Sequence, residues 1–223
     1  MNKIFENMTP GTVYERCILA ALAHAVMNGR YPELAAEQLW EWGLMKNYSF
    51  LDMEGIRGAM SFKDDYFVCV LRNESSFIFG KDRLLRAFFG EADEDIRRLA
   101  AEQTMMYLFY RLDGKTEPAA SAAFYGRGGD IFSVHSEAEI MRISENVIYP
   151  FVCSENEALE HWKGYNDMTK DQAELVMEIY RQRIGTEGHL TPDIPIIKPL
   201  TDWFGEDISE CIETFNEMEI FPE

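Results

Sequence analysis

Carboxylates near the C-terminus are the residues whose types and spacing most clearly suggest a chemical role. Five of them lie close together: Glu206, Asp207, Glu210, Glu213 and Glu217. After Lys198 the chain contains no basic residue. In a helix, residues three and four positions apart are neighbours, so these glutamates would repel one another by about 0.2 to 0.5 kcal/mol per pair. Such an array suits a cationic surface, and we predict that it forms a partner-binding face.

The same segment has an apolar side at helical spacing. The pattern i, i+3, i+4, i+7, i+10 is followed by Ile208, Cys211, Ile212, Phe215 and Met218. We therefore expect a helix over residues 206–218 that packs through these side chains and turns its carboxylates to solvent. A helix selected for stability alone would alternate Glu with Lys. The arrangement is compatible with an outward-facing field and also with drift towards acidity.

The negative charge is concentrated in the second half of the chain. The 223 residues include 21 basic and 39 acidic side chains, for a net charge of −18. Residues 1–112 contain 13 basic and 16 acidic side chains, whereas residues 113–223 contain 8 and 23, a net charge of −15. This field would repel nucleic acid and anionic membranes and attract a basic protein. Solubility alone is the competing explanation.

An aromatic cluster is the second candidate site. Trp40, Trp42 and Tyr48 lie close together in the chain, and Arg57 follows. The rings would form the walls of a ligand pocket, and the guanidinium would bind an anionic group. Packing of the same rings in the core is the alternative, and it requires no ligand.

This region also resembles a pattern in uncharacterised small soluble bacterial proteins. The resemblance rests on Trp40, Asn47-Tyr48, Asp52, Gly55, Arg57-Gly58 and Phe62. It covers residues 40–62 alone. It implies no activity, and no catalytic residue is carried over from it.

The chain shows no motif that defines a reaction. Ser75–Asp82 lacks the first Gly and the final Ser or Thr of a phosphate-binding loop. Cys153 precedes His161 by eight residues, a spacing that fixes no nucleophile and base. The histidines are too scattered to predict a metal site, although the fold could still assemble them: His24, His135, His161 and His189. We predict no catalytic residue, metal or cofactor, and an enzyme is the less favoured interpretation.

Four widely spaced cysteines indicate the cellular compartment in which the protein is found. Each lies among apolar neighbours: Cys17, Cys69, Cys153 and Cys211. We expect buried, reduced thiols and hence a cytoplasmic protein. The longest uncharged apolar stretch, Cys17–Met27, has eleven residues, whereas a membrane span needs about 20.

The hydrophobic periodicity predicts an α+β fold, with a small antiparallel sheet of two hairpins packed against several helices. The hairpins are expected at residues 56–72 and 122–134, and a further strand at residues 77–79. Capping patterns predict helices that begin near Thr9 or Thr12, after Ser154 and after Thr169. Other helices are expected at residues 32–42, at 82–89 and from residue 92, and a Pro-rich extended segment at 185–199.

Residues 113–118 are rich in turn formers and mark the change in charge. We expect one α+β domain over residues 1–223, which this segment could subdivide. The near-neutral half is residues 1–112. The acidic, mostly helical half is residues 119–223.

Three functions remain open from the sequence. The leading hypothesis is a non-enzymatic, cytoplasmic protein whose acidic half binds a basic protein; in a bacterium this would be an immunity- or antitoxin-like protein that masks a basic toxin. The second is an enzyme or small-ligand binder with a pocket at Trp40, Trp42, Tyr48 and Arg57. The third is a structural subunit of a homo-oligomer. Neither nucleic acid nor a membrane is expected as a partner.

Overall fold

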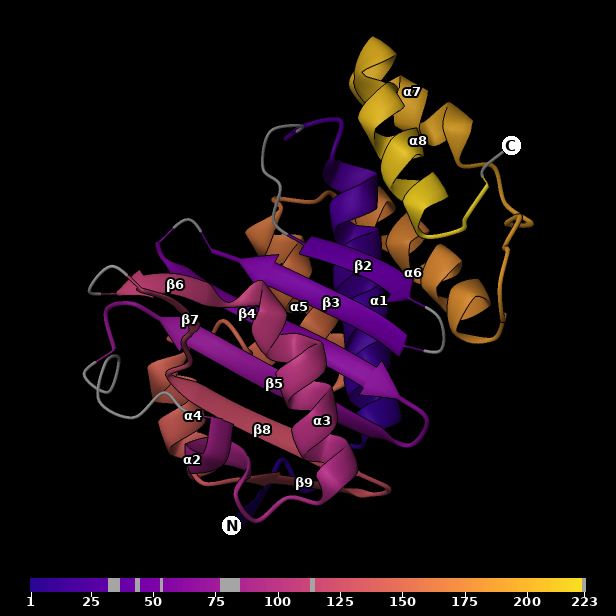
Figure 1. The fold of residues 1–223 in the computed structure, drawn as a ribbon. Coiled ribbons are helices and arrows are strands. Elements are labelled where there is room, and N and C mark those ends of the chain that lie inside the picture. Colours follow the sequence, from indigo (N-terminus) through magenta and orange to yellow (C-terminus); the bar gives the residue numbers. More distant parts are fainter. Residues whose placement is uncertain (32–36, 43–44, 53, 77–84, 113–114, 222–223) are drawn as a thin grey trace.

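A seven-stranded antiparallel sheet lies between two groups of helices (Figure 1). The computed structural model describes residues 1–31, 37–42, 45–52, 54–76, 85–112 and 115–221. The α+β prediction is confirmed. No helix in these ranges is both long enough and apolar enough to cross a bilayer.

The sheet has the strand order β1-β9-β8-β5-β4-β3-β2. Its strands are β1 (Asn2–Ile4), β2 (Glu37–Trp42), β3 (Met45–Leu51), β4 (Ile56–Lys63), β5 (Tyr66–Asn73), β8 (Ala122–Arg127) and β9 (Asp130–Ser133). Both predicted hairpins, β4–β5 and β8–β9, are present, and β5 pairs with β8 to join them. The sheet is larger than predicted because β1, β2 and β3 extend it. A separate hairpin consists of β6 (Phe109–Leu112) and β7 (Lys115–Pro118).

The prediction of a helix over residues 32–42 is wrong for the part of it that the structure describes. Residues 37–42 form β2, which pairs antiparallel with β3 from Glu37↔Phe50 to Trp42↔Met45. The Leu and Trp residues of this segment also suit a helix by spacing, but pairing with a neighbouring strand satisfies the backbone instead. The strand predicted at residues 77–79 lies outside the described residues.

Eight α-helices and three short 3₁₀ segments are found in the described ranges. The α-helices are α1 (Pro10–Met27), α2 (Leu85–Phe89), α3 (Glu94–Glu102), α4 (Glu137–Ile143), α5 (Glu155–Tyr165), α6 (Lys170–Ile184), α7 (Ile197–Phe204) and α8 (Ile208–Glu217). The 3₁₀ segments are η1 (Thr104–Tyr107), η2 (Tyr149–Phe151) and η3 (Gly205–Asp207). Because α7 begins at Ile197, the segment predicted as extended over 185–199 ends in a helix.

Local capping chemistry explains where the helices begin. Ser154 and Thr169 form capping boxes with Glu157 and Gln172, as predicted for α5 and α6. Of the two starts considered for α1, the one at Thr9 is correct, because Thr9 caps the helix through Thr12 and Pro10 occupies its first turn.

Helix α1 is the centre of the larger core. Thirteen of its 18 residues are buried. It lies behind the sheet in Figure 1 and contacts α5, α6, α8 and β2. The buried Arg16 donates through Nε to the carbonyl of Cys153 at 3.3 Å and through a terminal nitrogen to the Tyr180 hydroxyl at 2.9 Å. These bonds tie α1 to the start of α5 and to α6.

The central strand β5 is covered on both faces, as its unbroken apolar run predicts. Phe67, Cys69 and Leu71 belong to the core around α1. Val68 and Val70 belong to a second core, beneath α2, α3 and η1. Each core contains residues from both sides of residues 113–118. The subdivision of the domain at that segment stays a prediction.

Gly58 is required by the packing of β4 against β3, and we predict that Gly58→Ala destabilises the protein by about 1 to 3 kcal/mol. An added Cβ would lie 2.2 Å from Cζ of Phe50. That ring stacks on Phe151 at 5.3 Å and has little room to move. Urea unfolding measures the change. Gly164→Ala in α5 is the control, because its Cβ would meet nothing and the helix should gain about 0.5 to 1 kcal/mol.

Candidate functional site

Helix α8 packs against the C-terminal end of α1 through buried contacts. Cys211, Phe215 and Met218 are buried, which confirms this part of the predicted inner face. The Cys211 sulfur accepts a hydrogen bond from the Gly29 amide at 3.0 Å. Asn28 donates from its side chain to the carbonyl of Glu210 at 3.3 Å and to the hydroxyl of Thr214 at 3.0 Å. These bonds join residues more than 180 positions apart and attach α8 to the C-terminal end of α1.

The five predicted partner-binding carboxylates lie together on η3 and α8. Four are exposed and Glu210 is half-buried; the four are Glu206, Asp207, Glu213 and Glu217. None of the five forms an ion pair with any residue that the structure describes. Figure 1 shows α7 and α8 beside one end of α1, beyond the sheet.

The apolar side of α8 is only partly covered. Ile208 and Ile212, predicted to be inner residues, are half-buried. They are part of an open groove of about 730 Å³, whose other lining residues are Glu206, Ser209, Glu213, Asn216 and Glu217. Both isoleucines lie at the margin of the face that packs on α1. The acidic face of α8 therefore includes an apolar strip.

Part of the acidic excess elsewhere in the second half is compensated by the first half. Lys3 pairs with Asp130, Arg16 with Glu155 and Arg30 with Asp167. Within the second half, Lys170 and Lys198 pair with Glu174 and Asp202. No such compensation reaches the carboxylates of η3 and α8 within the described residues. The uncompensated charge is therefore a local feature of this surface as well as a property of the whole half.

The aromatic pocket predicted from the sequence is not formed by Tyr48 and Arg57. Tyr48 is 0 % exposed and packs against Phe151 with ring centroids 5.2 Å apart. Tyr48 pairs with Met60 across the sheet, and Arg57 is three residues from Met60 on the same strand. Because side chains alternate between faces, Tyr48 and Arg57 lie on opposite faces of the sheet. Trp40 and Trp42 are in β2, and their side chains lie outside what the structure describes.

The histidines and cysteines do not assemble into a recognisable site. Burial raises the pKa of the Cys153 thiol to about 11, with a smaller contribution from Glu157. Burial also lowers the pKa of His161, whose ring packs against Trp162 at 5.0 Å. His24 and His135 likewise have lowered pKa values, chiefly because they are partly buried. Within the described ranges, no three His, Cys, Asp or Glu side chains are grouped so that they could hold a metal ion.

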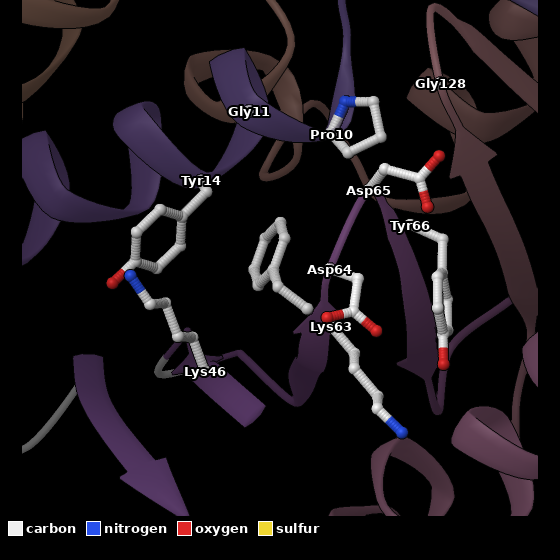
Figure 2. Close-up of a pocket in the computed structure, with 10 residues that line it drawn as sticks. Pro10, Gly11, Tyr14, Lys46, Lys63, Asp64, Asp65, Tyr66 and Gly128 are labelled. Carbon is white, nitrogen blue, oxygen red and sulfur yellow. The ribbon is translucent and has the colours of Figure 1, made fainter. Parts of the chain in front are cut away.

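A recess that the sequence analysis did not foresee lies at the N-terminal end of α1 (Figure 2). It includes Tyr14, Lys46 and Phe62, with Asp64 and Asp65 in the two-residue turn between β4 and β5. Aspartates are common in such turns, so their presence in the sequence does not by itself indicate a recess. No spacing signal could have found the recess, because its lining residues come from four separate segments.

Comparison of the chain with protein-family models, with curated proteins and with solved structures finds no match. The geometry and charge of the described residues are therefore the basis for the function proposed below.

We predict that no thiol of the native protein reacts rapidly with a disulfide reagent such as DTNB at pH 8. All four cysteines are free and buried. With a pKa of about 11, the Cys153 and Cys211 thiols are almost wholly protonated at that pH, and the thiolate is the reactive form. Absorbance should report slow release in the native state and four equivalents in guanidinium chloride. Rapid labelling that Cys153→Ser removes would contradict the buried placement of Cys153.

Repulsion along α8 predicts that Glu217→Lys stabilises the protein by about 1 kcal/mol at low salt. The substitution removes a like-charge pair with Glu213, creates an opposite-charge pair at the same spacing, and places a cation in the last turn of the helix. Urea unfolding at low and high ionic strength measures the gain, which should shrink as salt rises. Glu217→Gln, which removes the negative charge but adds no cation, should gain about half as much or less. Equal stability of all three proteins would show that the carboxylates do not repel.

Proposed function

We propose that this chain is a non-enzymatic binding protein whose acidic α8 face engages a basic protein. The observation that carries the proposal is the set of five carboxylates on η3 and α8, which lack ion pairs in the described residues and flank the half-buried Ile208 and Ile212. Basic side chains of a partner would supply the missing counter-charges. The isoleucines would supply apolar contact.

The carboxylates would act mainly on the rate of association. A surface of one sign attracts a partner of the opposite sign from a distance and can raise the association rate by about 10- to 1,000-fold at low salt. Within the described residues, no Glu on α8 has an ion-pair partner that it would have to release. Binding would therefore also relieve the repulsion between neighbouring glutamates.

The contacts that attach α8 to the end of α1 support a binding role. Cys211 and Asn28 connect the helix to the end of α1, and Phe215 is fully buried beneath it. A helix held in this way loses little conformational freedom when a partner binds. The acidic array would therefore be presented in one geometry.

The concrete form of this proposal is an immunity- or antitoxin-like protein that acts in the cytoplasm and covers the basic surface of a toxin. Toxins that cleave nucleic acid need a basic surface for their substrate, and an acidic protein can occupy that surface. The four free, buried thiols would suit a reducing compartment.

The two other functions stay predictions. A homo-oligomer would have to associate through a surface other than η3 and α8, because two copies of this acidic face repel each other. Light scattering at low and high protein concentration tests for such an assembly. An enzyme or ligand site at Trp40, Trp42, Tyr48 and Arg57 would need Tyr48 and Arg57 on the same side of the sheet, and their placement on opposite faces does not favour it.

Salt-dependent binding tests the proposal. The tagged protein is used to capture partners from cells of its source at about 50 mM salt, and the captured protein is then purified and its Kd measured. We expect the affinity to fall at least tenfold between about 50 and 300 mM salt. The triple variant Glu210→Gln, Glu213→Gln, Glu217→Gln should bind at least tenfold more weakly and show a smaller salt dependence.

A matched control separates the acidic face from net charge. The variant Glu160→Gln, Asp171→Asn, Glu178→Gln removes three exposed carboxylates from α5 and α6 and should change the Kd less than about twofold. The proposal is wrong if both triple variants weaken binding equally, or if binding is indifferent to salt and to the α8 substitutions.

A further inference from the structure

A second recess lies between the first half of α1 and the C-terminal end of α6, two helices that pack side by side (Figure 1). We call it the α1–α6 recess, and its volume is about 620 Å³. Recesses of about 300 to 1,000 Å³ are typical of sites for small molecules. Because α8 packs at Asn28 and Gly29, beyond the other end of α1, this recess is independent of the surface used by the proposed function.

The recess is lined by a buried cation that has no carboxylate partner. Arg183, on α6, is 9 % exposed and forms no ion pair with any residue that the structure describes. It belongs to the half of the chain with a net charge of −15, where carboxylates are plentiful. A buried guanidinium is costly unless neighbouring groups compensate its charge, so the groups around Arg183 decide what it can bind.

Backbone carbonyls compensate one side of this guanidinium. Nη1 of Arg183 donates to the carbonyls of Thr186 at 3.1 Å and Gly188 at 2.8 Å. Both of these residues line the recess, so the guanidinium lies at its wall. Nε is buried and has no hydrogen-bond partner. Nη2 also lacks a partner among the described residues, but it is not closed off from solvent. Nη2 is therefore the donor that is open to a ligand, and a carboxylate is the group that suits it.

Two glutamates also line the recess, and neither neutralises Arg183. Glu187 lies between Thr186 and Gly188, yet its side chain is exposed and forms no ion pair with any described residue. Glu15, on α1, is half-buried and is likewise without an ion pair in the described ranges. Because water screens a half-buried carboxylate less than an exposed one, Glu15 is the stronger site for a ligand ammonium.

The rest of the lining offers apolar contact. Ile18 is buried and Tyr14 is half-buried, whereas Ile184, the last residue of α6, is 42 % exposed. An aliphatic ligand group would cover part of this exposed side chain. Lys46 lines the recess too, but its Nζ lies 4.7 Å from the centroid of the Tyr14 ring, and we assign no ligand group to it.

We propose that the α1–α6 recess binds a free α-amino acid with an aliphatic side chain. The ligand carboxylate pairs with Nη2 of Arg183, its ammonium pairs with Glu15, and its side chain lies on Ile18 and Ile184. A divalent anion such as phosphate fits less well, because Glu15 and Glu187 repel it. A simple amine also fits less well, because Arg183 repels it.

L-Leucine is a suitable probe. Titration of the full-length, ¹⁵N-labelled protein should shift the amide signals of Gly185 and Gly188 in a saturable manner, with a Kd of about 1 mM or tighter. Blocking the ammonium as N-acetyl-leucine, or the carboxylate as leucinamide, should weaken binding at least fivefold. Inorganic phosphate should bind at least tenfold more weakly than L-leucine.

Two variants assign the ends of the ligand. Glu15→Gln should bind L-leucine and N-acetyl-leucine equally weakly. Arg183→Gln keeps a donor for the loop carbonyls, removes the charge, and should no longer distinguish L-leucine from leucinamide. If the amide signals of Gly185 and Gly188 show that this variant has lost its loop, the blocked ligands and Glu15→Gln decide the question on an intact recess. Glu178→Gln, an exposed acid on α6, is the control and should bind like the wild type.

Three results would overturn the proposal. The first is the absence of saturable shifts at Gly185 and Gly188 up to about 10 mM L-leucine. The second is equal affinity for L-leucine and for its singly blocked forms. The third is binding of phosphate as tight as that of L-leucine, which would identify a site for anions alone. The variant Glu210→Gln, Glu213→Gln, Glu217→Gln should bind L-leucine normally, so failure here is distinct from failure of the α8 proposal.

Discussion

The burial of α1 is the constraint on which the rest of the structure depends. A helix that is apolar on nearly all sides must be covered on all sides. Leu19, Leu22 and Val26 are 0 % exposed, and each buried side chain of this kind contributes about 1.5 to 3 kcal/mol. The sheet covers one side of α1, and α5, α6 and α8 contact it elsewhere. The first and second halves of the chain thereby share one core.

Arg16 shows how this core accepts a charged group. Its guanidinium is bonded to the Cys153 carbonyl and the Tyr180 hydroxyl, and Glu155 lies 3.8 Å away. A buried cation without such partners would cost several kcal/mol. Burial also raises the pKa of the Tyr180 hydroxyl, which accepts from Arg16, to about 12. At the junction of α1, α5 and α6, the same contacts that pack the helices together also supply the hydrogen-bond partners of the buried Arg16.

The two ends of α1 position the two candidate sites, and the sites have different electrostatics. At the C-terminal end, α8 presents carboxylates of one sign, which lowers the stability of the helix and suits a partner of opposite sign. At the N-terminal end, the α1–α6 recess combines the buried Arg183 with Glu15 and Glu187. A field of one sign acts over a long range at low salt.

The sequence by itself determined the features that depend on a few neighbouring residues. Ser154 with Glu157 and Thr169 with Gln172 start helices because a side chain reaches a backbone amide three residues away. The fold class, the two central hairpins and the acidic side of α8 follow from periodicity in the same local way.

Only the tertiary structure decided that residues 37–42 pair as β2, that Tyr48 and Arg57 lie on opposite faces, and that Ile208 and Ile212 stay partly uncovered. Strand pairing and burial depend on segments far away in the chain. A local sequence pattern contains no information about which segment will pair with it or cover it. The recess beside Tyr14 is the clearest case, because four segments must meet before it exists.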